Sequence, residues 1–157
     1  MHRNVRAVVE AGKVLGVDVD PHEFPEGTRS AADAALAIGV DLGQIVKSLV
    51  FAVDGEVCVA LVSGDNLLDE AKLAKAAGGD EAWREDADTV RDATGFPIGG
   101  VPPFGFREPL RVFIDEDLMD YEELWAAAGT PHVNFAITPA GLVRATGGMV
   151  CDLAKHR

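Results

Sequence analysis

The sequence predicts a single α/β domain that spans residues 1–157. Two apolar, β-branched runs flank an Asp54-Gly55 pair, which is a strong signal for a β-hairpin. Helical patterns stand before and after this hairpin, so helices and strands alternate along the chain. Hydrophobic residues make up 48% and charged residues 25% of the sequence, which is ordinary for a globular protein of this length.

The first forty residues predict a helix, a short strand and a second helix. Valines and a glycine within residues 5–12 recur at the spacing of one helix face. Residues 17–24 alternate loosely and suggest a short strand. The alanine-rich segment 31–38 predicts a helix that Thr28 or Ser30 can cap and whose small side chains allow close packing.

Residues 44–51 predict a buried strand that carries an unusual lysine. Lys47 is the one charged residue between Asp41 and Asp54. Because strand side chains alternate, Lys47 and Ser48 point to opposite faces. An ammonium among apolar neighbours is costly unless something pairs with it. Lys47 is therefore either a strand-end lysine that reaches solvent or a group that awaits a negative ligand or a developing negative charge.

Further elements follow in order along the chain. We expect strands over residues 57–62, 110–114, 132–137 and 150–153, and helices over residues 69–77, 86–93 and 138–147. Residues 121–128 are open between helix and strand. Asp115, Glu116 and Asp117 are expected to form a solvated turn, because three adjacent acids do not converge on a metal ion from a strand or a helix.

Residues 94–106 form the second unusual stretch. They carry no charge, and four glycines and three prolines forbid a regular element. Such a segment is either a loop over the core or a loop whose backbone N–H groups approach a ligand. Its spacing fits neither a Walker loop nor a dinucleotide fingerprint.

Charge and cysteine content limit the class of protein. The formal net charge of −12 repels nucleic acid on average, so any contact with RNA should use a small local patch. Cys58 and Cys151 lie in no CxxC pair and are expected to be buried free thiols in a reducing compartment. We expect a cytoplasmic protein without membrane partner, because neither a secretory signal nor a bilayer-spanning run is found.

The usual catalytic sets are missing from the sequence. No GxSxG elbow, HExxH motif or zinc-type Cys/His spacing is found, and no metal site is expected. His132 and Asn134 share one face of a predicted strand, where the histidine is either structural or, with Asn134, part of a polar pocket wall. The sequence thus offers a lone lysine, an uncharged Gly/Pro loop and this His/Asn pair. Such a set is better suited to binding a ligand and stabilising a developing charge than to nucleophilic catalysis.

Several of these segments, in this order, resemble the YbaK/EbsC-like prolyl-tRNA editing-domain family, including its stand-alone ProX-type members. The matching segments are residues 34–39, 44–51, 62–66, 94–105, 115–118 and 142–148. The resemblance implies a compact α/β domain with a mixed, largely antiparallel, barrel-like sheet flanked by helices. It also implies a trans-editing deacylase that hydrolyses the ester of a mischarged tRNA, such as tRNAPro carrying Cys or Ala.

The resemblance assigns roles to individual residues. Lys47 corresponds to the central lysine of the family, and Lys47 and Gly100 are the expected catalytic residues, since an ammonium and backbone N–H groups can stabilise an oxyanion. Binding of a phosphate or of the aminoacyl carbonyl is the alternative role of Lys47. The expected substrate-binding residues are Ser48, Ser63, Gly99, Val101, Pro102, Phe104, His132 and Asn134. The implied partners are the acceptor end of the tRNA and prolyl-tRNA synthetase, and no cofactor is expected.

Two departures from the family pattern leave the edited amino acid open. Many relatives carry Thr or Asn where this chain has Ser48, and cysteine-specific members place Asp and Ser where this chain offers Thr130, His132 and Asn134. A non-catalytic binder of aminoacyl-tRNA or an aminoacyl-nucleotide, and a small-molecule ester hydrolase, are the alternatives. The unranked candidates for RNA contact are Arg29, Arg91, Arg107, Arg111 and Arg144.

Overall fold

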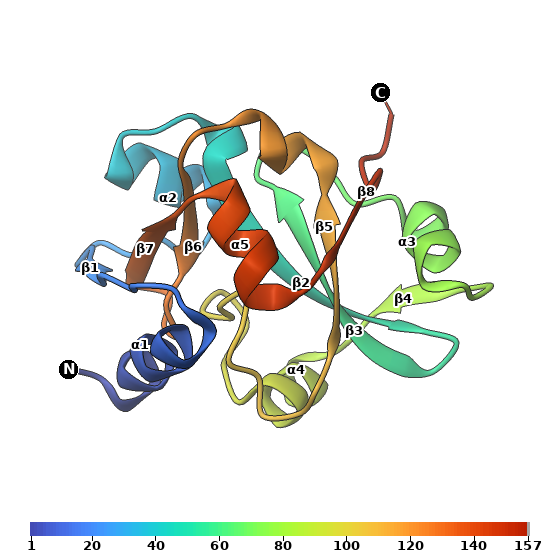
Figure 1. Ribbon diagram of the computed structural model, residues 1–157, viewed down its shortest axis with the longest axis horizontal. Coiled ribbons are helices and arrows are strands. Elements are labelled where there is room, and N and C mark those ends of the chain that lie inside the picture. Colours follow the sequence, from blue (N-terminus) through green and yellow to red (C-terminus); the bar gives the residue numbers. More distant parts are fainter. Residues whose placement is uncertain (157) are drawn as a thin grey trace.

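The computed structural model describes residues 1–156, in which helices surround a mixed sheet (Figure 1). The helices are α1 (Arg3–Leu15), α2 (Ala31–Ile38), α3 (Glu70–Ala77), α4 (Ala87–Thr94) and α5 (Pro139–Thr146). The strands are β1 (His22–Glu23), β2 (Ile45–Val53), β3 (Glu56–Ser63), β4 (Ala82–Arg84), β5 (Arg111–Asp115), β6 (Leu124–Ala127), β7 (Val133–Ile137) and β8 (Met149–Cys151). Short 3-10 turns precede β2 and follow β5.

The strands form one sheet in the order β1-β7-β6-β2-β3-β5-β8, and β4 pairs with β2 beside this path. The pairs β1·β7, β6·β7, β2·β3 and β2·β4 are antiparallel, while β2·β6, β3·β5 and β5·β8 are parallel. The α/β class and the mixed sheet are therefore confirmed. The central position of β2 follows from its three strand partners.

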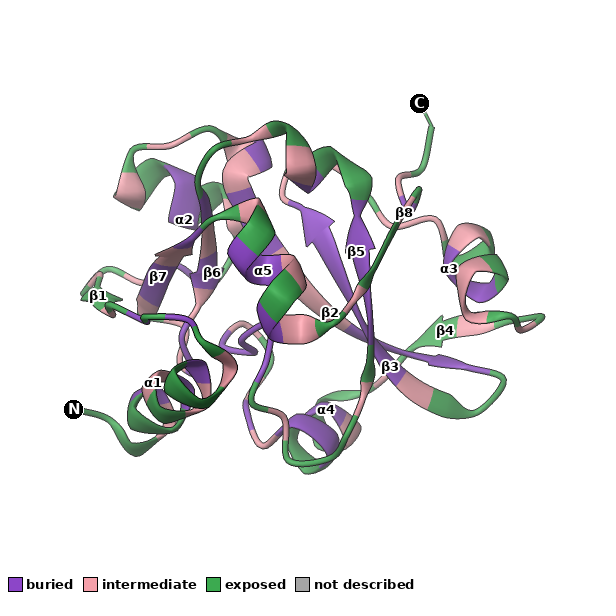
Figure 2. Cartoon of the chain, in the orientation of Figure 1, coloured by how far each residue is buried: buried purple, intermediate pink, exposed green. Residues whose placement is uncertain are grey.

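Both faces of the sheet are covered, so most residues of the central strands are buried, apart from the half-buried Lys47, Ser48 and Leu49 in the middle of β2 (Figure 2). On one face, side chains of β2, β3, β5, β6 and β7 pack with α1, α4 and α5. On the other face, Phe51, Phe113 and their neighbours pack with Leu73 of α3, and a smaller cluster joins α2 to the start of β2. Continuous apolar runs such as residues 45–53 are typical of strands buried in this way.

Local signals set the element boundaries as the sequence predicted. Asp54 and Gly55 have φ values of 51° and 87°, which suit a two-residue hairpin turn between β2 and β3. Ser30, rather than Thr28, caps α2 by accepting a hydrogen bond from the N–H of Asp33. Thr138 caps α5, whose first residue is a proline.

Three expectations need correction, for residues 17–24, Asp115 and Cys151, and two further points were missed or left open. Residues 17–24 form a strand only over β1, because the rest of this segment crosses the core without a strand partner. The strand β4 was not predicted, and of the two alternatives left open for residues 121–128 the structure shows the strand, β6. Asp115 does not belong to a solvated turn, because it is 0% exposed at the end of β5. Cys58 is buried as expected, whereas Cys151 is half-buried.

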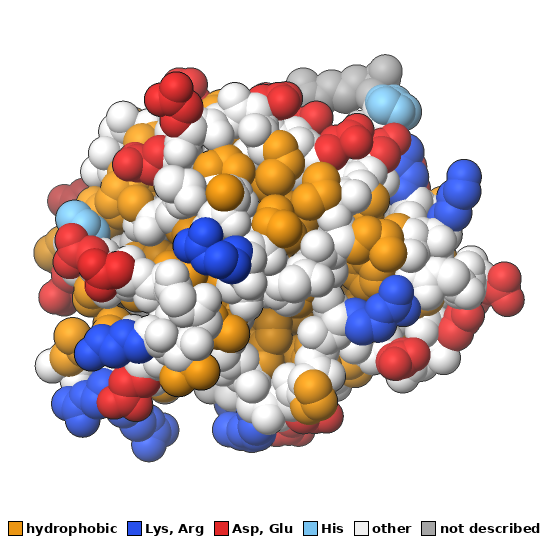
Figure 3. Space-filling model, in the orientation of Figure 1, with side chains coloured by type: hydrophobic (Ala, Val, Ile, Leu, Met, Phe, Trp, Pro, Cys, Tyr) orange, Lys and Arg blue, Asp and Glu red, His pale blue; other side chains and the backbone are white. Residues whose placement is uncertain are grey.

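The surface reflects the acidic composition. On the face drawn in Figure 3, acidic side chains are spread around the outline, and Lys and Arg stand singly or in small groups. None of the described helices combines the length and the apolar character needed to cross a bilayer.

Candidate active site

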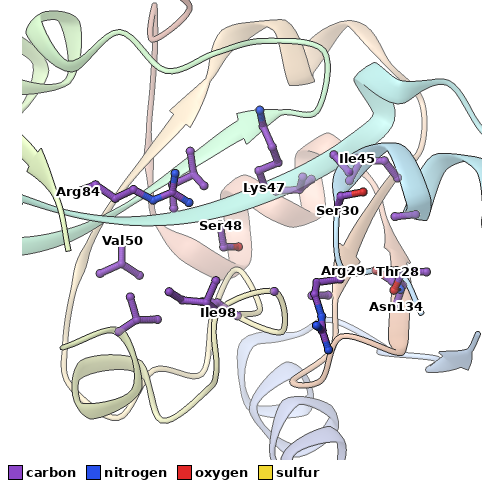
Figure 4. Close-up of a pocket in the computed structure, with 18 of the residues that line it drawn as sticks. Thr28, Arg29, Ser30, Ile45, Lys47, Ser48, Val50, Arg84, Ile98 and Asn134 are labelled. Atoms are coloured by element: carbon purple, nitrogen blue, oxygen red, sulfur yellow. The ribbon is translucent and has the colours of Figure 1, made fainter. Parts of the chain in front are cut away.

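A cavity of about 370 Å³ lies between α2, β2, β4 and the loop that follows α4 (Figure 4). Its described lining includes three cations and one anion, although the whole chain carries a net charge of −12. The residues that line it are Thr28, Arg29, Ser30, Ala31, Ala34, Ile45, Val46, Lys47, Ser48, Leu49, Val50, Arg84, Glu85, Val90, Ile98, Gly99, Val101, Ala127 and Asn134.

The cavity opens where one edge of β2 lacks a partner strand. On this edge β6 pairs with β2 only as far as Val46, and β4 begins to pair at Phe51. The C=O of Val50 accepts a hydrogen bond of 3.1 Å from the N–H of Glu85 on the same edge. Because backbone groups two residues apart point the same way, the N–H and C=O of Ser48 also face this opening. Both faces of β2 therefore reach one cavity.

Lys47 and Ser48 occupy opposite faces of β2, as alternation predicted (Figure 4). The Nζ of Lys47 donates a hydrogen bond to the backbone C=O of Asn66, in the turn after β3. Ser48 points toward the loop that carries Ile98, and its buried Oγ has no hydrogen-bond partner among the described residues. A buried hydroxyl without a partner is uncommon in folded proteins, and such groups often belong to binding sites.

The charge of Lys47 is tuned by its surroundings. Burial lowers the pKa of the Lys47 ammonium below its ordinary value, because the charged form loses hydration. Asp115 and Asp65 oppose this change by raising the pKa, and Arg84 adds to it by lowering the pKa. A partly buried lysine with a perturbed pKa beside a cavity is a candidate functional group.

A hydrogen-bonded pair forms the far wall of the cavity. The hydroxyl of Thr28 donates to the C=O of Pro131 at 2.8 Å, so it accepts from the Nδ2 of Asn134. This pairing fixes the orientation of the buried Asn134 amide. Its Oδ1 is left as the acceptor that Asn134 can offer to a ligand in the cavity.

The uncharged loop approaches the cavity through Gly99 and Val101. Gly99 has a φ of 87°, which favours glycine. A Cβ on Gly100 would lie 2.8 Å from the Cα of Thr130 and 3.0 Å from the backbone of Gly129, so only glycine fits there. The N–H of Gly100 donates to the C=O of Pro97 at 2.9 Å, within the loop itself.

Five of the expected site residues do not line the cavity. Gly100 and Pro102 are buried in the loop, and Phe104 packs in the core against the ring of Phe135. Ser63 is 2% exposed and is held by structural hydrogen bonds. His132 precedes β7 and is exposed, so it does not share the buried wall position of Asn134.

The structure shows which arginines line the cavity. Arg84 lines the cavity and was missed, because the short strand β4 that carries it has no apolar pattern. Of the arginines considered for RNA contact, Arg29 lines the cavity. The others lie elsewhere: Arg111 is stacked over the ring of Phe113, and Arg144 is 3.5 Å from the C=O of Gly16. No cluster of three His, Cys, Asp or Glu side chains suited to a metal ion occurs within residues 1–156.

Comparisons with known proteins identify the class to which this fold and site belong. The profile of the aminoacyl-tRNA editing domain matches residues 25–145. The chain therefore belongs to the aminoacyl-tRNA editing domain family. A proline–tRNA ligase of Maridesulfovibrio salexigens is 34% identical over 109 residues, which cover 68% of this chain but only 19% of the ligase.

Shorter relatives match along most of their length. YwhH of Bacillus subtilis, an uncharacterized protein, is 30% identical over 123 residues, 78% of each chain. EbsC of Enterococcus faecalis, provisionally named a Cys-tRNA(Pro)/Cys-tRNA(Cys) deacylase, is 28% identical and covers 96% of this chain and 92% of its own. A crystal structure provisionally described as a trans-editing enzyme for prolyl-tRNA synthetase superposes with a TM-score of 0.93 at 43% identity and covers 99% of each chain.

Proposed function

We propose that this protein is a trans-editing deacylase that hydrolyses the ester between a wrong amino acid and the 3′-terminal adenosine of tRNA. The substrate we propose is tRNAPro that carries a small amino acid such as Cys or Ala. The observation that carries this proposal is the cavity, where Arg29, Lys47 and Arg84 stand against one anion, Glu85, in a strongly acidic protein. A cationic cavity attracts a polyanion locally while the remaining surface repels it.

The opening at β2 suits an extended nucleotide end. Lys47 and the loop reach the cavity from opposite faces of β2, so a substrate that both contact must lie across the free edge of the strand. A terminal adenosine and its ester can cross this edge, where the N–H and C=O of Ser48 face the ligand. The phosphate preceding the adenosine would meet the exposed Arg29 or Arg84.

The chemistry follows from where charge develops. Attack of water on the ester carbonyl produces an oxyanion, and an ammonium already in place stabilises it without reorganisation. In this proposal Lys47 supplies that charge. The Gly99-Gly100 loop assists through the backbone N–H groups of Gly99 and Val101, two residues that line the cavity. The N–H of Gly100 is not used, because it donates to a carbonyl within the loop. Gly100 contributes by allowing the close packing on Gly129 that sets the loop.

The wall of the cavity bears on the choice of amino acid. The Oγ of Ser48 has no hydrogen-bond partner among the described residues, and the hydrogen bond described for the Asn134 side chain uses its Nδ2 rather than its Oδ1. We propose that the Ser48 Oγ and the Asn134 Oδ1 contact the aminoacyl group, whose amine can donate to Asn134. Prolyl-tRNA synthetase is the proposed partner that produces the mischarged tRNA, and this role would place the protein in the cytoplasm.

Deacylation of a panel of charged tRNAs tests the proposal. Purified protein is incubated with tRNAPro charged with Cys, Ala, Ser or Pro, and release of the amino acid is followed for wild type, Lys47→Ala and the control Lys75→Ala. Lys75 is exposed on α3, away from the cavity. Release of one mischarged species by wild type and the control, but not by Lys47→Ala, is expected.

Other outcomes point to the alternatives. Binding of aminoacyl-tRNA with no turnover of any species would indicate a non-catalytic binder. Equal cleavage of aminoacyl esters that lack tRNA would indicate a small-molecule ester hydrolase. Circular dichroism and urea unfolding of Lys47→Ala show whether lost activity reflects lost chemistry or a lost fold.

A further inference from the structure

The hydrogen bond described for the ammonium of Lys47 goes to a backbone carbonyl in the turn after β3. The Nζ of Lys47 donates to the backbone C=O of Asn66, and the N–H of Asn66 donates to the C=O of Ser63 at 2.9 Å, which closes the turn after β3. The position of the Lys47 charge therefore depends on how firmly this turn is fixed.

The side chain of Asn66 anchors the turn to the end of β5. Its Nδ2 donates to the Oδ2 of Asp115 at 2.9 Å and to the Oδ2 of Asp117 at 2.8 Å. Asp115 also accepts from the N–H of Ser63 at 3.0 Å and from the N–H of Asp117 at 3.0 Å. These bonds connect β3, its turn and β5 on the side of β2 that carries Lys47.

Asp115 is an unusual anion. It is 0% exposed, and its described hydrogen-bond donors are amides rather than a cation. Taking a carboxylate out of water is costly, and hydrogen bonds alone leave its charge in place. The field of this charge reaches Lys47, where Asp115 is the strongest charged influence that favours the ammonium.

We propose that Asn66 and Asp115 are positioning residues for Lys47. Asn66 holds the ammonium through its backbone C=O, and Asp115 fixes Asn66 while it supplies the negative charge that offsets the burial of the lysine. The importance of this arrangement for catalysis rests on the proposed deacylase function. The arrangement itself can be tested without that function.

The groups that face Lys47 predict opposite responses. Asp115 on β5 and Asp65 in the turn raise the pKa of Lys47, while burial and Arg84 on β4 lower it. Asp115→Asn should therefore lower the pKa of Lys47 further, and Arg84→Gln should raise it. General damage to the fold would not lower the pKa of Lys47 in one variant and raise it in the other.

The first experiment measures the pKa of Lys47 directly, by NMR titration of the lysine Cε–Hε signals, with Lys47 assigned through Lys47→Arg. A fall in Asp115→Asn and a rise in Arg84→Gln are expected. Unchanged values in both variants would overturn the electrostatic part of the proposal. This measurement stands even when no aminoacyl-tRNA is hydrolysed, so its failure and that of the proposed function are distinguishable.

The second experiment uses Asn66→Ala, which keeps the backbone C=O and removes the anchor. A loss in kcat of about 10- to 100-fold with little change in KM is expected, because a displacement of a catalytic group by about 1 Å can cost about 100-fold. Asp117→Ala is the matched control. The exposed Asp117 also accepts a hydrogen bond from the Asn66 amide, and its replacement leaves the hydrogen bond from Asn66 to Asp115 in place.

Asn66→Ala and Asp117→Ala together distinguish misplacement of Lys47 from damage to the fold. Asp115→Asn places a donor NH2 against the N–H of either Ser63 or Asp117 and so lowers stability as well. Asn66→Ala therefore carries the kinetic test. A kcat for Asn66→Ala equal to that of wild type, or a loss of kcat in Asp117→Ala as large as in Asn66→Ala, would refute the positioning role of Asn66.

Discussion

Replacing Ser48 by alanine should separate function from stability. The Oγ of Ser48 is buried at the cavity and has no hydrogen-bond partner among the described residues. An unsatisfied buried polar group costs about 1–3 kcal/mol, so its removal takes away a penalty rather than a contact. We expect Ser48→Ala to leave the free energy of unfolding unchanged or to raise it by about 1 kcal/mol.

Ser63 provides the matched control. It lies in the β2–β3 pair and its Oγ is also buried, but this Oγ donates to the C=O of Gly43 at 2.7 Å. Ser63→Ala leaves that carbonyl without its donor and should cost about 1–3 kcal/mol. With a urea slope of about 2 kcal/mol per molar, the unfolding midpoint would fall by roughly 1 M.

The activities should rank in the opposite way. If Ser48 contacts the aminoacyl group, its loss removes one hydrogen bond in the transition state and lowers kcat/KM about tenfold. The assay is urea unfolding beside deacylation of the species identified by the tRNA panel. A clear loss of stability in Ser48→Ala would show that Ser48 has a structural partner, and unchanged kcat/KM would remove it from the site.

Two more predictions concern charge and thiol chemistry. Arg29→Gln and Arg84→Gln should each weaken tRNA binding and reduce the slope of log K against log salt concentration by about 0.7–0.9, whereas Arg111→Gln should not. Binding isotherms from low to high salt measure these slopes. Equal slopes for all three variants would contradict a role for the cavity cations. Burial raises the pKa of Cys58 to about 11, so at pH 8 it should stay unreactive toward a disulfide reagent until the protein unfolds, while half-buried Cys151 reacts slowly in the folded state. Two equally fast thiols in the folded protein would refute this expectation, and Cys151→Ser identifies the signal.

Features set by a few neighbouring residues were predictable from the sequence. The hairpin at Asp54-Gly55 needs two residues with positive φ, and this pair supplies them. The caps at Ser30 and Thr138 depend on a hydroxyl three residues before a free N–H. Each such signal is complete within one turn of chain, so no knowledge of the remaining fold is required.

Segment 17–24 shows how a correct burial pattern can give the wrong element. Val17 and Val19 are buried and Asp18 and Asp20 are exposed, which is the alternation of a strand. However, strand pairing in this region begins only at His22, opposite β7. Alternating burial reports which side of the chain faces the core, whereas a strand also requires a neighbour for its backbone, and the neighbour is not encoded locally.

The same distinction explains which parts of the site were found. Lys47 and Ser48 stood out because a polar pair interrupts an apolar run. Arg84 was missed and Asp115 was assigned to a solvated turn, because their relation to Lys47 arises from two pairings that are distant in sequence: β4 with β2, and β5 with β3. The β2 opening arises in the same way, since β6 and β4 pair with one edge of β2 and stop short of each other. The chain thus encodes its candidate catalytic lysine locally, but the topology of the sheet creates the space and the charges that would make this lysine useful.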